Sequence, residues 1–230
     1  MSRNKNLEKL ITMKNLLLSV FLFSSIIVCG QNLSIGIKGG TLFSSVHKTD
    51  PREGITMYKD SHLTPTFGLN AELRLFNSFY GVLEVNYEEK GFAEHYFSTF
   101  SSVAPTPPES LFRVDNKSSF NYVAFPILLR YKYGQKVKIY GSTGLSTSVL
   151  VDTKELNSSY LLAYNTKKID LSGIIEAGLE LNLSTNIALN IGARYDRSIT
   201  HHNKHPRPID GGELRHVTYN FYGGIKYYIK

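Results

Sequence analysis

The stretch YVAFPILLRYKY, residues 122–133, decides the fold class. Every second residue from Val123 to Tyr133 is apolar or aromatic, and Arg130 and Lys132 lie between them. Successive side chains of a β-strand point to opposite faces of the sheet, so a spacing of two predicts a strand with one apolar and one polar face.

The same alternation recurs along the chain after Gln31, where no window has sustained helical periodicity. The eight expected strands cover residues 33–46, 63–76, 79–90, 120–133, 137–150, 168–182, 187–199 and 216–230. Eight such segments predict an all-β protein, and we expect a single antiparallel up-and-down β-barrel.

One side of each expected strand is apolar, and we expect this side to carry no charge. Its members include Ile35 and Ile37, Leu69 and Leu73, Leu83 and Val85, Ile127 and Leu129, Ile139 and Leu145, Ile175 and Leu179, Leu189 and Ile191, and Phe221 and Ile225. The other side carries seven acidic and seven basic residues. They are Lys38, Glu72, Arg74, Glu84, Glu88, Arg130, Lys132, Lys138, Asp170, Glu176, Glu180, Arg194, Asp196 and Lys226.

The balance of opposite charges predicts a structural network of ion pairs on the polar side. An eight-stranded barrel has an interior only wide enough for its own side chains, and unpaired buried ions are costly. We therefore expect these fourteen residues to fill the lumen by packing rather than to line a solute pathway.

The alternation is compatible with two kinds of barrel, because the apolar side can face either inward or outward. A soluble barrel of the lipocalin kind places it around a central ligand, whereas a membrane barrel places it against lipid. Strands of 12 to 15 residues exceed the nine to eleven that cross a tilted span. Short connections near residues 77–78, 134–135 and 183–186 alternate with long ones at 47–62, 91–119, 151–167 and 200–215. This rhythm is typical of periplasmic turns and external loops, and tyrosines at strand ends are typical of membrane interfaces, so we expect a transmembrane barrel.

The first thirty residues have the layout of an export signal. Residues 13–30 read MKNLLLSVFLFSSIIVCG, a lysine followed by a short apolar run and a small residue. We expect residues 1–30 to be a signal peptide, with 1–12 as an upstream extension or Met13 as the true start, and residues 31–230 to form one barrel domain. Cys29, the only cysteine, leaves lipidation as an alternative, although Val28 is bulkier than a lipobox prefers.

The charge of the chain argues against nucleic acid as a partner. The formal net charge of +7 falls to +4 when Arg3, Lys5, Lys9, Lys14 and Glu8 leave with the signal peptide. The remaining surplus is spread along the chain rather than clustered.

The last long connection holds the only residues that suggest chemistry. His201, His202 and His205 stand near Asp210, Glu213 and His216, and imidazoles suit Zn²⁺ or Cu²⁺. Prolines and glycines around them indicate an irregular, solvated loop, so we expect no metal site. Ser198 beside the histidines leaves a lipid-modifying hydrolase as an alternative, but a nucleophile needs a positioned base. We expect no catalytic residue and no cofactor.

The proline and glycine residues within the expected strands lead to two structural predictions. Pro126 removes a ladder donor, so we expect a bulge there. Gly39-Gly40 and Gly223-Gly224, in the first and last strands, should allow close approach where the barrel closes.

Several phrases resemble the PorT-like outer-membrane β-barrel family. They are IGIKGGTLFSS, YVAFPILLRYKY, IYGSTGLSTS, IDLSGIIEAGLEL and NFYGGIKYYIK, which together span most of residues 33–230. The resemblance implies a barrel in the bacterial outer membrane and implies no reaction. The chain departs from the usual aromatic ending of such barrels, since Lys230 follows Ile229.

These expectations combine into one functional hypothesis. The protein is a monomeric, non-enzymatic scaffold in outer-membrane lipid that presents four long loops, through which a protein partner can bind. The alternatives are a narrow channel or a component of a secretion or uptake assembly, and a soluble periplasmic carrier.

Overall fold

The computed structural model describes residues 33–49, 56–58, 60–98, 112–156, 167–200 and 213–229. Nine strands are present in this part of the chain. Their bounds are β1 (Leu33–Thr49), β2 (Thr56–Tyr58), β3 (Asp60–Phe76), β4 (Phe79–Ser98), β5 (Phe112–Gly134), β6 (Val137–Leu156), β7 (Ile169–Asn182), β8 (Ile187–Ser198) and β9 (Glu213–Ile229). No helix within these ranges is long and apolar enough to cross a membrane.

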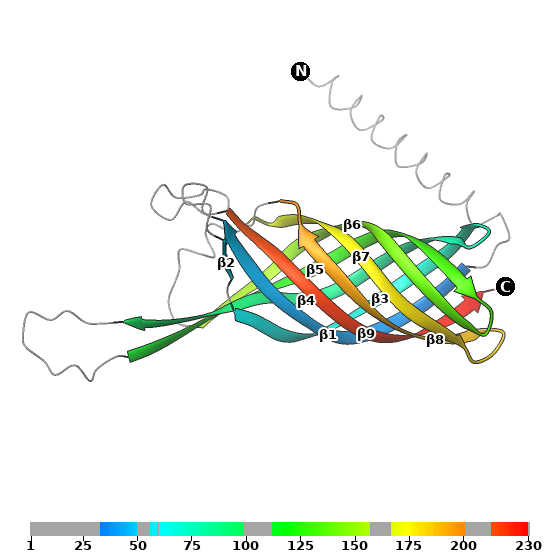
Figure 1. Cartoon of the computed structure of the whole chain (residues 1–230), viewed down its shortest axis with the longest axis horizontal. Helices are drawn as coiled ribbons and strands as arrows, with labels where there is room; N and C mark the ends of the chain where they lie inside the picture. Colours follow the sequence, from blue (N-terminus) through cyan, green and yellow to red (C-terminus); the bar gives the residue numbers. More distant parts are fainter. Residues whose placement is uncertain are drawn as a thin grey trace, which may run out of the picture.

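Eight of the strands close into an antiparallel barrel, which confirms the predicted fold. Each strand pairs with its neighbour in the order β1-β3-β4-β5-β6-β7-β8-β9, and β1 also pairs with β9 along its whole length. Figure 1 shows the strands running obliquely around one cylinder. The sequence did not predict β2, which pairs with residues 47–49 of β1 beyond the last β1–β3 pair.

Tight turns join the strands at one end of the barrel, here called the turn end. Residues 77–78 link β3 to β4, residues 135–136 link β5 to β6, and residues 183–186 link β7 to β8. Asn77 adopts a positive φ of 44°, a conformation that asparagine tolerates. Gly134 has a φ of 120°, where a Cβ atom would lie 2.2 Å from the Val137 carbonyl oxygen. The predicted short connections are therefore confirmed, and the opposite end is the loop end.

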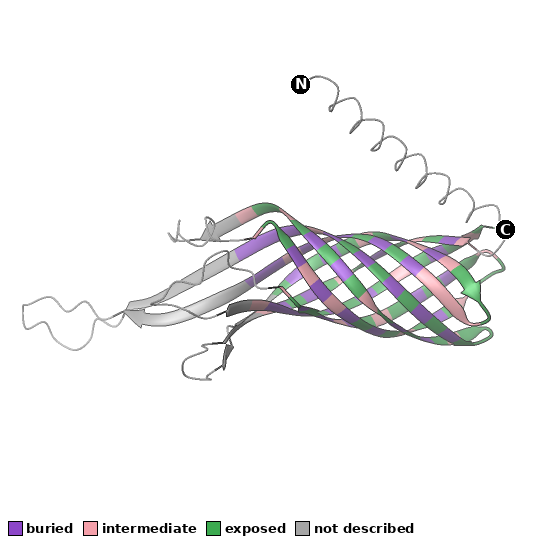
Figure 2. Ribbon diagram, turned by 90° about the horizontal axis from the view of Figure 1, so that it is seen from above, coloured by how far each residue is buried: buried purple, intermediate pink, exposed green. Residues whose placement is uncertain are grey.

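The apolar side of the strands faces outward. Figure 2 shows buried and exposed residues alternating along each strand. Ile37, Leu69 and Ile127 are 60%, 61% and 64% exposed, whereas their neighbours Lys38, Asn70 and Leu128 are buried. A soluble carrier needs the reverse arrangement, so that alternative is wrong.

The expectation of an uncharged outer side is wrong at a few positions, all of them towards the loop end of the described strands. Glu89 is partly buried and accepts a hydrogen bond from Ser119 Oγ at 2.5 Å, and Arg197 is exposed. Between them and the turn end the outward face is apolar or uncharged.

Aromatic side chains gather on the outer face near the turn end. Phe76, Phe79 and Tyr131 form a chain of ring contacts with centroids 4.9 and 5.2 Å apart. Tyr133 and Tyr227 are also exposed there. In the loop half, Tyr195 contacts Tyr219 at 5.2 Å. Such rings are typical of the two interfaces of a membrane.

The expected bulge at Pro126 is wrong. Pro126 pairs with Ser146 of β6, and the register is unchanged on both sides of it. On the β4 side the pairing is only interrupted, since no partner pairs span residues 84–85, and it resumes in the same register. Proline has no backbone N–H group, so the pairing with β4 is interrupted at this point, but neither strand gains an extra residue. The register shift in the β5–β6 pairing lies instead between Asn121 and Tyr122, where Val151 of β6 is the extra residue.

Glycines allow the seam between β1 and β9 to close tightly, as predicted. Gly39 lies opposite Gly223, and Lys38 lies opposite Gly224. A Cβ atom on Gly40 would lie 2.1 Å from the Phe221 carbonyl oxygen, so only glycine fits there.

Candidate functional site: the ion-paired lumen

Four charged residues form a closed ring across the lumen near the turn end. Glu72, Lys132, Glu180 and Lys226 come from β3, β5, β7 and β9, so that every second strand contributes one residue. Lys226 Nζ donates to Glu72 Oε2 at 3.0 Å and to Glu180 Oε2 at 2.9 Å. Lys132 Nζ donates to Glu180 Oε2 at 2.7 Å and to Glu72. This turn-end ring joins opposite walls of the barrel by alternating charges.

A second cluster fills the centre of the lumen. Glu176 accepts hydrogen bonds from Arg130 Nη2 at 2.5 Å, from Arg194 Nε at 2.9 Å and from Ser142 Oγ at 3.1 Å. Arg194 Nη2 also lies 2.7 Å from Glu84 Oε2, which accepts from Lys38 Nζ at 2.6 Å. Because β4 and β8 are opposite strands, the contact between Glu84 and Arg194 spans the full width of the barrel.

Arg130 connects the two layers. Its Nη1 donates to Glu72 Oε2 at 2.8 Å, while its Nη2 contacts Glu176. Charge-assisted hydrogen bonds of this length are the strong class, and two carboxylates satisfy one guanidinium here. The turn-end ring and the central cluster are therefore one connected network.

Two tyrosines pack into the centre of this network. The hydroxyl groups of Tyr140 and Tyr222 lie 2.9 Å apart. The Arg130 guanidinium lies 4.4 Å from the centroid of the Tyr140 ring, and Lys38 Nζ lies 4.9 Å from that of Tyr222. Cations over aromatic faces are stabilising, especially when desolvated.

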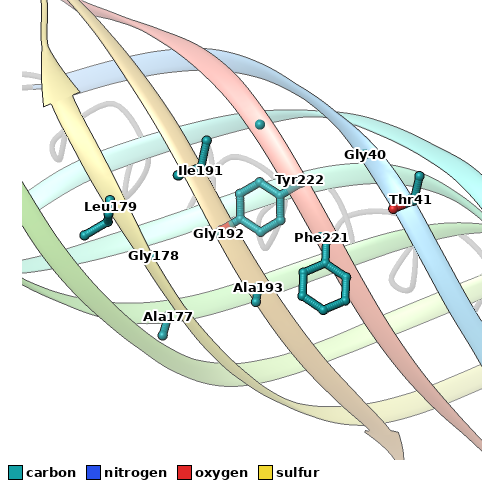
Figure 3. A pocket seen from close by; sticks show the side chains of 11 residues that line it. Gly40, Thr41, Ala177, Gly178, Leu179, Ile191, Gly192, Ala193, Phe221 and Tyr222 are labelled. Carbon is teal, nitrogen blue, oxygen red and sulfur yellow. The ribbon is translucent and has the colours of Figure 1, made fainter.

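Glycines in the wall make room for the two rings. A Cβ atom on Gly178 would lie 2.3 Å from the Tyr140 hydroxyl oxygen, and one on Gly192 would lie 2.6 Å from both tyrosine hydroxyls. Figure 3 shows Tyr222 reaching from β9 toward Gly192 on β8, whereas Phe221 points away. The same glycines leave a shallow hollow on the outer wall, lined mainly by small and apolar residues.

Contacts are longer in the loop half of the lumen. Lys90 Nζ lies 3.4 Å from Glu88 Oε2, 3.8 Å from Asp170 Oδ2 and 3.3 Å from Ser148 Oγ. Asp170 accepts shorter hydrogen bonds from Ser198 Oγ at 2.7 Å and Thr200 Oγ1 at 2.9 Å. The lysine of this region is thus held less closely than those of the turn-end ring.

The structure places twelve of the fourteen residues named from the sequence on the buried inner face. Those residues are Lys38, Glu72, Glu84, Glu88, Arg130, Lys132, Asp170, Glu176, Glu180, Arg194, Asp196 and Lys226. Lys138 is partly exposed and reaches Glu180 Oε1 at 3.4 Å. Arg74 is a correction, because it is exposed at the turn end and its Nε donates to the Asn77 carbonyl oxygen at 2.7 Å. Arg74 pairs with Tyr80 in the same register in which Glu72 pairs with Val82, so it keeps the inward parity and is exposed because it lies at the open turn end of the barrel.

Three further members of the network were not predicted from the sequence. Lys90 has the same parity as Glu84 and Glu88, so the alternation itself could have found it. Tyr140 and Tyr222 also have the inward parity, but tyrosine was expected only at the interfaces.

The residues that suggested metal binding or hydrolysis lie mostly beyond the described ranges. These include His201, His202, His205 and Asp210. His216 is buried beside the rings of Phe120 and Tyr122, with centroids 6.0 and 6.2 Å away. Ser198 is buried and donates to Asp170. Within the described ranges no three His, Cys, Asp or Glu residues are grouped to hold a metal ion.

The comparison with protein families gives the same result as the geometry, which shows a barrel with an apolar exterior and an ionic interior. The model for "Outer membrane protein beta-barrel domain" matches residues 29–202. The chain belongs to this family. Its members' location places the protein in the bacterial outer membrane, where the apolar face meets hydrocarbon.

Solved structures with similar folds share little sequence with this member of the family. Neisserial surface protein A is 10% identical, with a TM-score of 0.49 over 84% of this chain and 96% of that chain. OprG from Pseudomonas aeruginosa is 12% identical, with a TM-score of 0.47 over 86% and 97%. The outer membrane protease OmpT from Escherichia coli is 11% identical, with a TM-score of 0.43 over 86% and 97%. No curated protein matches the chain.

Proposed function

We propose that the protein is a non-enzymatic scaffold of the outer membrane whose lumen is sealed and whose long loops present an interaction surface. The observation that carries this proposal is the closed turn-end ring of Glu72, Lys132, Glu180 and Lys226. An ion that crosses the barrel has to break at least one of these buried pairs, which is strongly unfavourable.

The β4–β5 hairpin supports the part of the proposal that concerns interaction. Residues 94–98 pair with residues 112–116, beyond the last pair of β3 at Ala93 and the last pair of β6 at Lys117. Figure 1 shows this two-stranded ribbon projecting past the other strands at the loop end. Within the described pairings its outer edges carry no third strand, and unpaired strand edges favour the addition of a partner's strand.

Three further expectations belong to the same proposal. Within the family, we infer that the chain is of the PorT-like type, on the phrases quoted above. Residues 1–30 are expected to be removed on export, which leaves residues 31–230 as the barrel domain. We expect a monomer, because the closed barrel has no free edge along the β1–β9 seam.

Planar-bilayer recording tests the sealed lumen. The purified, refolded protein should show no channel events, since the network joins opposite walls. The double variant Glu72→Ser with Lys132→Ser removes one charge of each sign from the ring and should also stay closed, because the central cluster still joins opposite walls through Arg194 and Glu84. Heat-modifiable gel migration establishes that both proteins are folded. Reproducible single-channel steps from the unsubstituted barrel would favour the narrow channel instead.

A further inference from the structure

Charge is distributed unevenly between the two ends of the barrel. Among the described residues on the turn-end side of the central cluster, five are cationic and two are acidic. They are Arg74, Lys132, Lys136, Lys138 and Lys226 against Glu72 and Glu180. The buried part of the loop half has the opposite bias, because Glu88, Asp170 and Asp196 all attract Lys90. The positive surplus is therefore a local property of the turn end.

The two carboxylates of the turn end are already occupied. Glu72 and Glu180 are buried, and the turn-end ring pairs both of them with its two lysines. Lys138 reaches Glu180 only as a third cation, at 3.4 Å. Arg74 and Lys136 form no ion pair within the described ranges, and no exposed acidic residue accompanies them at this end. Three cations of the turn end thus lack a carboxylate of their own.

Two of these three cations flank one outward-facing position of the β5–β6 hairpin. Val137 begins β6 and is exposed, and Lys136 and Lys138 stand directly before and after it. Tyr133, on the same outer face, is exposed and lies opposite Ile139. Tyrosine is enriched where hydrocarbon meets the lipid headgroups, and flexible lysine side chains extend toward that level. The pair of Lys136 and Lys138, here called the lysine pair, therefore lies at the height of the headgroups.

The turn end also determines which leaflet the lysine pair meets. Outer-membrane barrels have their short turns on the periplasmic side and their long loops outside. The turn of residues 135–136 is one of these short turns. The lipid around it belongs to the periplasmic leaflet, which consists of phospholipid.

We propose that the lysine pair binds the phosphate group of an anionic phospholipid in the periplasmic leaflet, with Tyr133 against the upper part of the acyl chain. Ammonium groups form charge-assisted hydrogen bonds with phosphate, and basic residues beside a membrane attract anionic headgroups. A zwitterionic headgroup brings a cation of its own, which the positive surplus of this end disfavours. This preference goes beyond the scaffold function, which needs lipid but no particular headgroup.

Fluorescence quenching at a tryptophan between the two lysines tests the preference. The full barrel carrying Val137→Trp is refolded into phosphatidylcholine vesicles, and the substitution supplies the only tryptophan of the chain. A minor share of the lipid is either phosphatidylglycerol or phosphatidylcholine, brominated at the top of the acyl chains. We expect brominated phosphatidylglycerol to be enriched about fivefold over brominated phosphatidylcholine at this position, the contribution of one basic residue near an anionic surface.

A second tryptophan at the other end of the same strand is the matched control. Val151 is also exposed on β6, but its exposed neighbour is Asp152, so Val151→Trp should show no enrichment of phosphatidylglycerol. Adding Lys136→Gln and Lys138→Gln to Val137→Trp should abolish the enrichment, because the charge is lost while the length of the side chains is nearly kept. Heat-modifiable gel migration establishes that each variant is folded.

The proposal is overturned if the two brominated lipids quench Val137→Trp equally, a result that needs no further variant. It is also overturned if the enrichment persists in the folded glutamine variant or is as strong at Val151→Trp, since the lysine pair is then not its source. Inorganic phosphate should lower the enrichment no more than chloride of the same ionic strength does. A larger effect of phosphate would show that the lysine pair binds the free anion instead of lipid.

Discussion

Replacing Glu176 with glutamine is expected to lower the free energy of unfolding by about 3 kcal/mol, the lower end of the cost of breaking a buried ion pair. Glu176 accepts from Arg130, Arg194 and Ser142, so its charge balances two guanidinium groups at once. The cost stays at the lower end because each arginine keeps a second carboxylate, Glu72 or Glu84. Urea titration of the barrel in lipid vesicles, followed by the heat-modifiable gel shift, measures the change.

Arg74→Gln is the matched control for this prediction. Arg74 is exposed at the turn end and touches no carboxylate within the described ranges, so its loss should change stability by less than about 0.5 kcal/mol. Equal stability of Glu176→Gln and the parent barrel would show that the central cluster is solvated rather than sealed.

Placing a charge on the outer wall should cost about 2–4 kcal/mol in the middle of the barrel and about 0–1 kcal/mol at its edge. Leu69 is 61% exposed and lies midway along β3, whereas Val137 is 53% exposed and begins β6 next to a turn. Leu69→Arg forces a guanidinium into hydrocarbon, but Val137→Arg can reach the headgroups. The same urea titration compares the two variants.

Both variants replace an exposed aliphatic side chain by arginine, so a difference between them reports the depth of the position in the membrane and not the type of substitution. If both substitutions have the same small effect, the wall between the aromatic residues does not contact lipid. If both substitutions lower the free energy of unfolding equally and strongly, the destabilisation arises from disturbed strand pairing rather than from contact with lipid.

The alternation of side chains predicted which face each residue occupies, because strand geometry allows only two directions. It assigned Ile37 to the outside and Lys38 to the inside without any knowledge of the barrel. It did not predict that Arg74 is exposed, because this residue has the inward parity but lies at the open turn end of the barrel. It also misplaced the irregularity in β5, because a proline at Pro126 interrupts a ladder without shifting it.

The partners within the lumen could not be predicted from the sequence. Arg130 meets Glu72 and Glu176, which are 58 and 46 residues away, only because the stagger of the closed barrel brings β3, β5 and β7 to the same depth. The place of Tyr140 and Tyr222 depends on the absence of side chains at Gly178 and Gly192, a relation among four strands. The length of β4 and β5 likewise depends on how far the two strands pair with each other.

A fluorescence measurement tests most directly whether the apolar outer face of the barrel is in contact with lipid. The chain has no tryptophan, so Leu69→Trp creates a single reporter at mid-height, and Val137→Trp creates one at the edge. In vesicles of lipids brominated midway along the acyl chain, we predict strong quenching of the Leu69→Trp variant and weak quenching of the Val137→Trp variant. If the emission of the Leu69→Trp variant is not quenched by brominated lipid but is quenched by aqueous acrylamide, the outer face does not contact lipid and the membrane orientation described above is wrong.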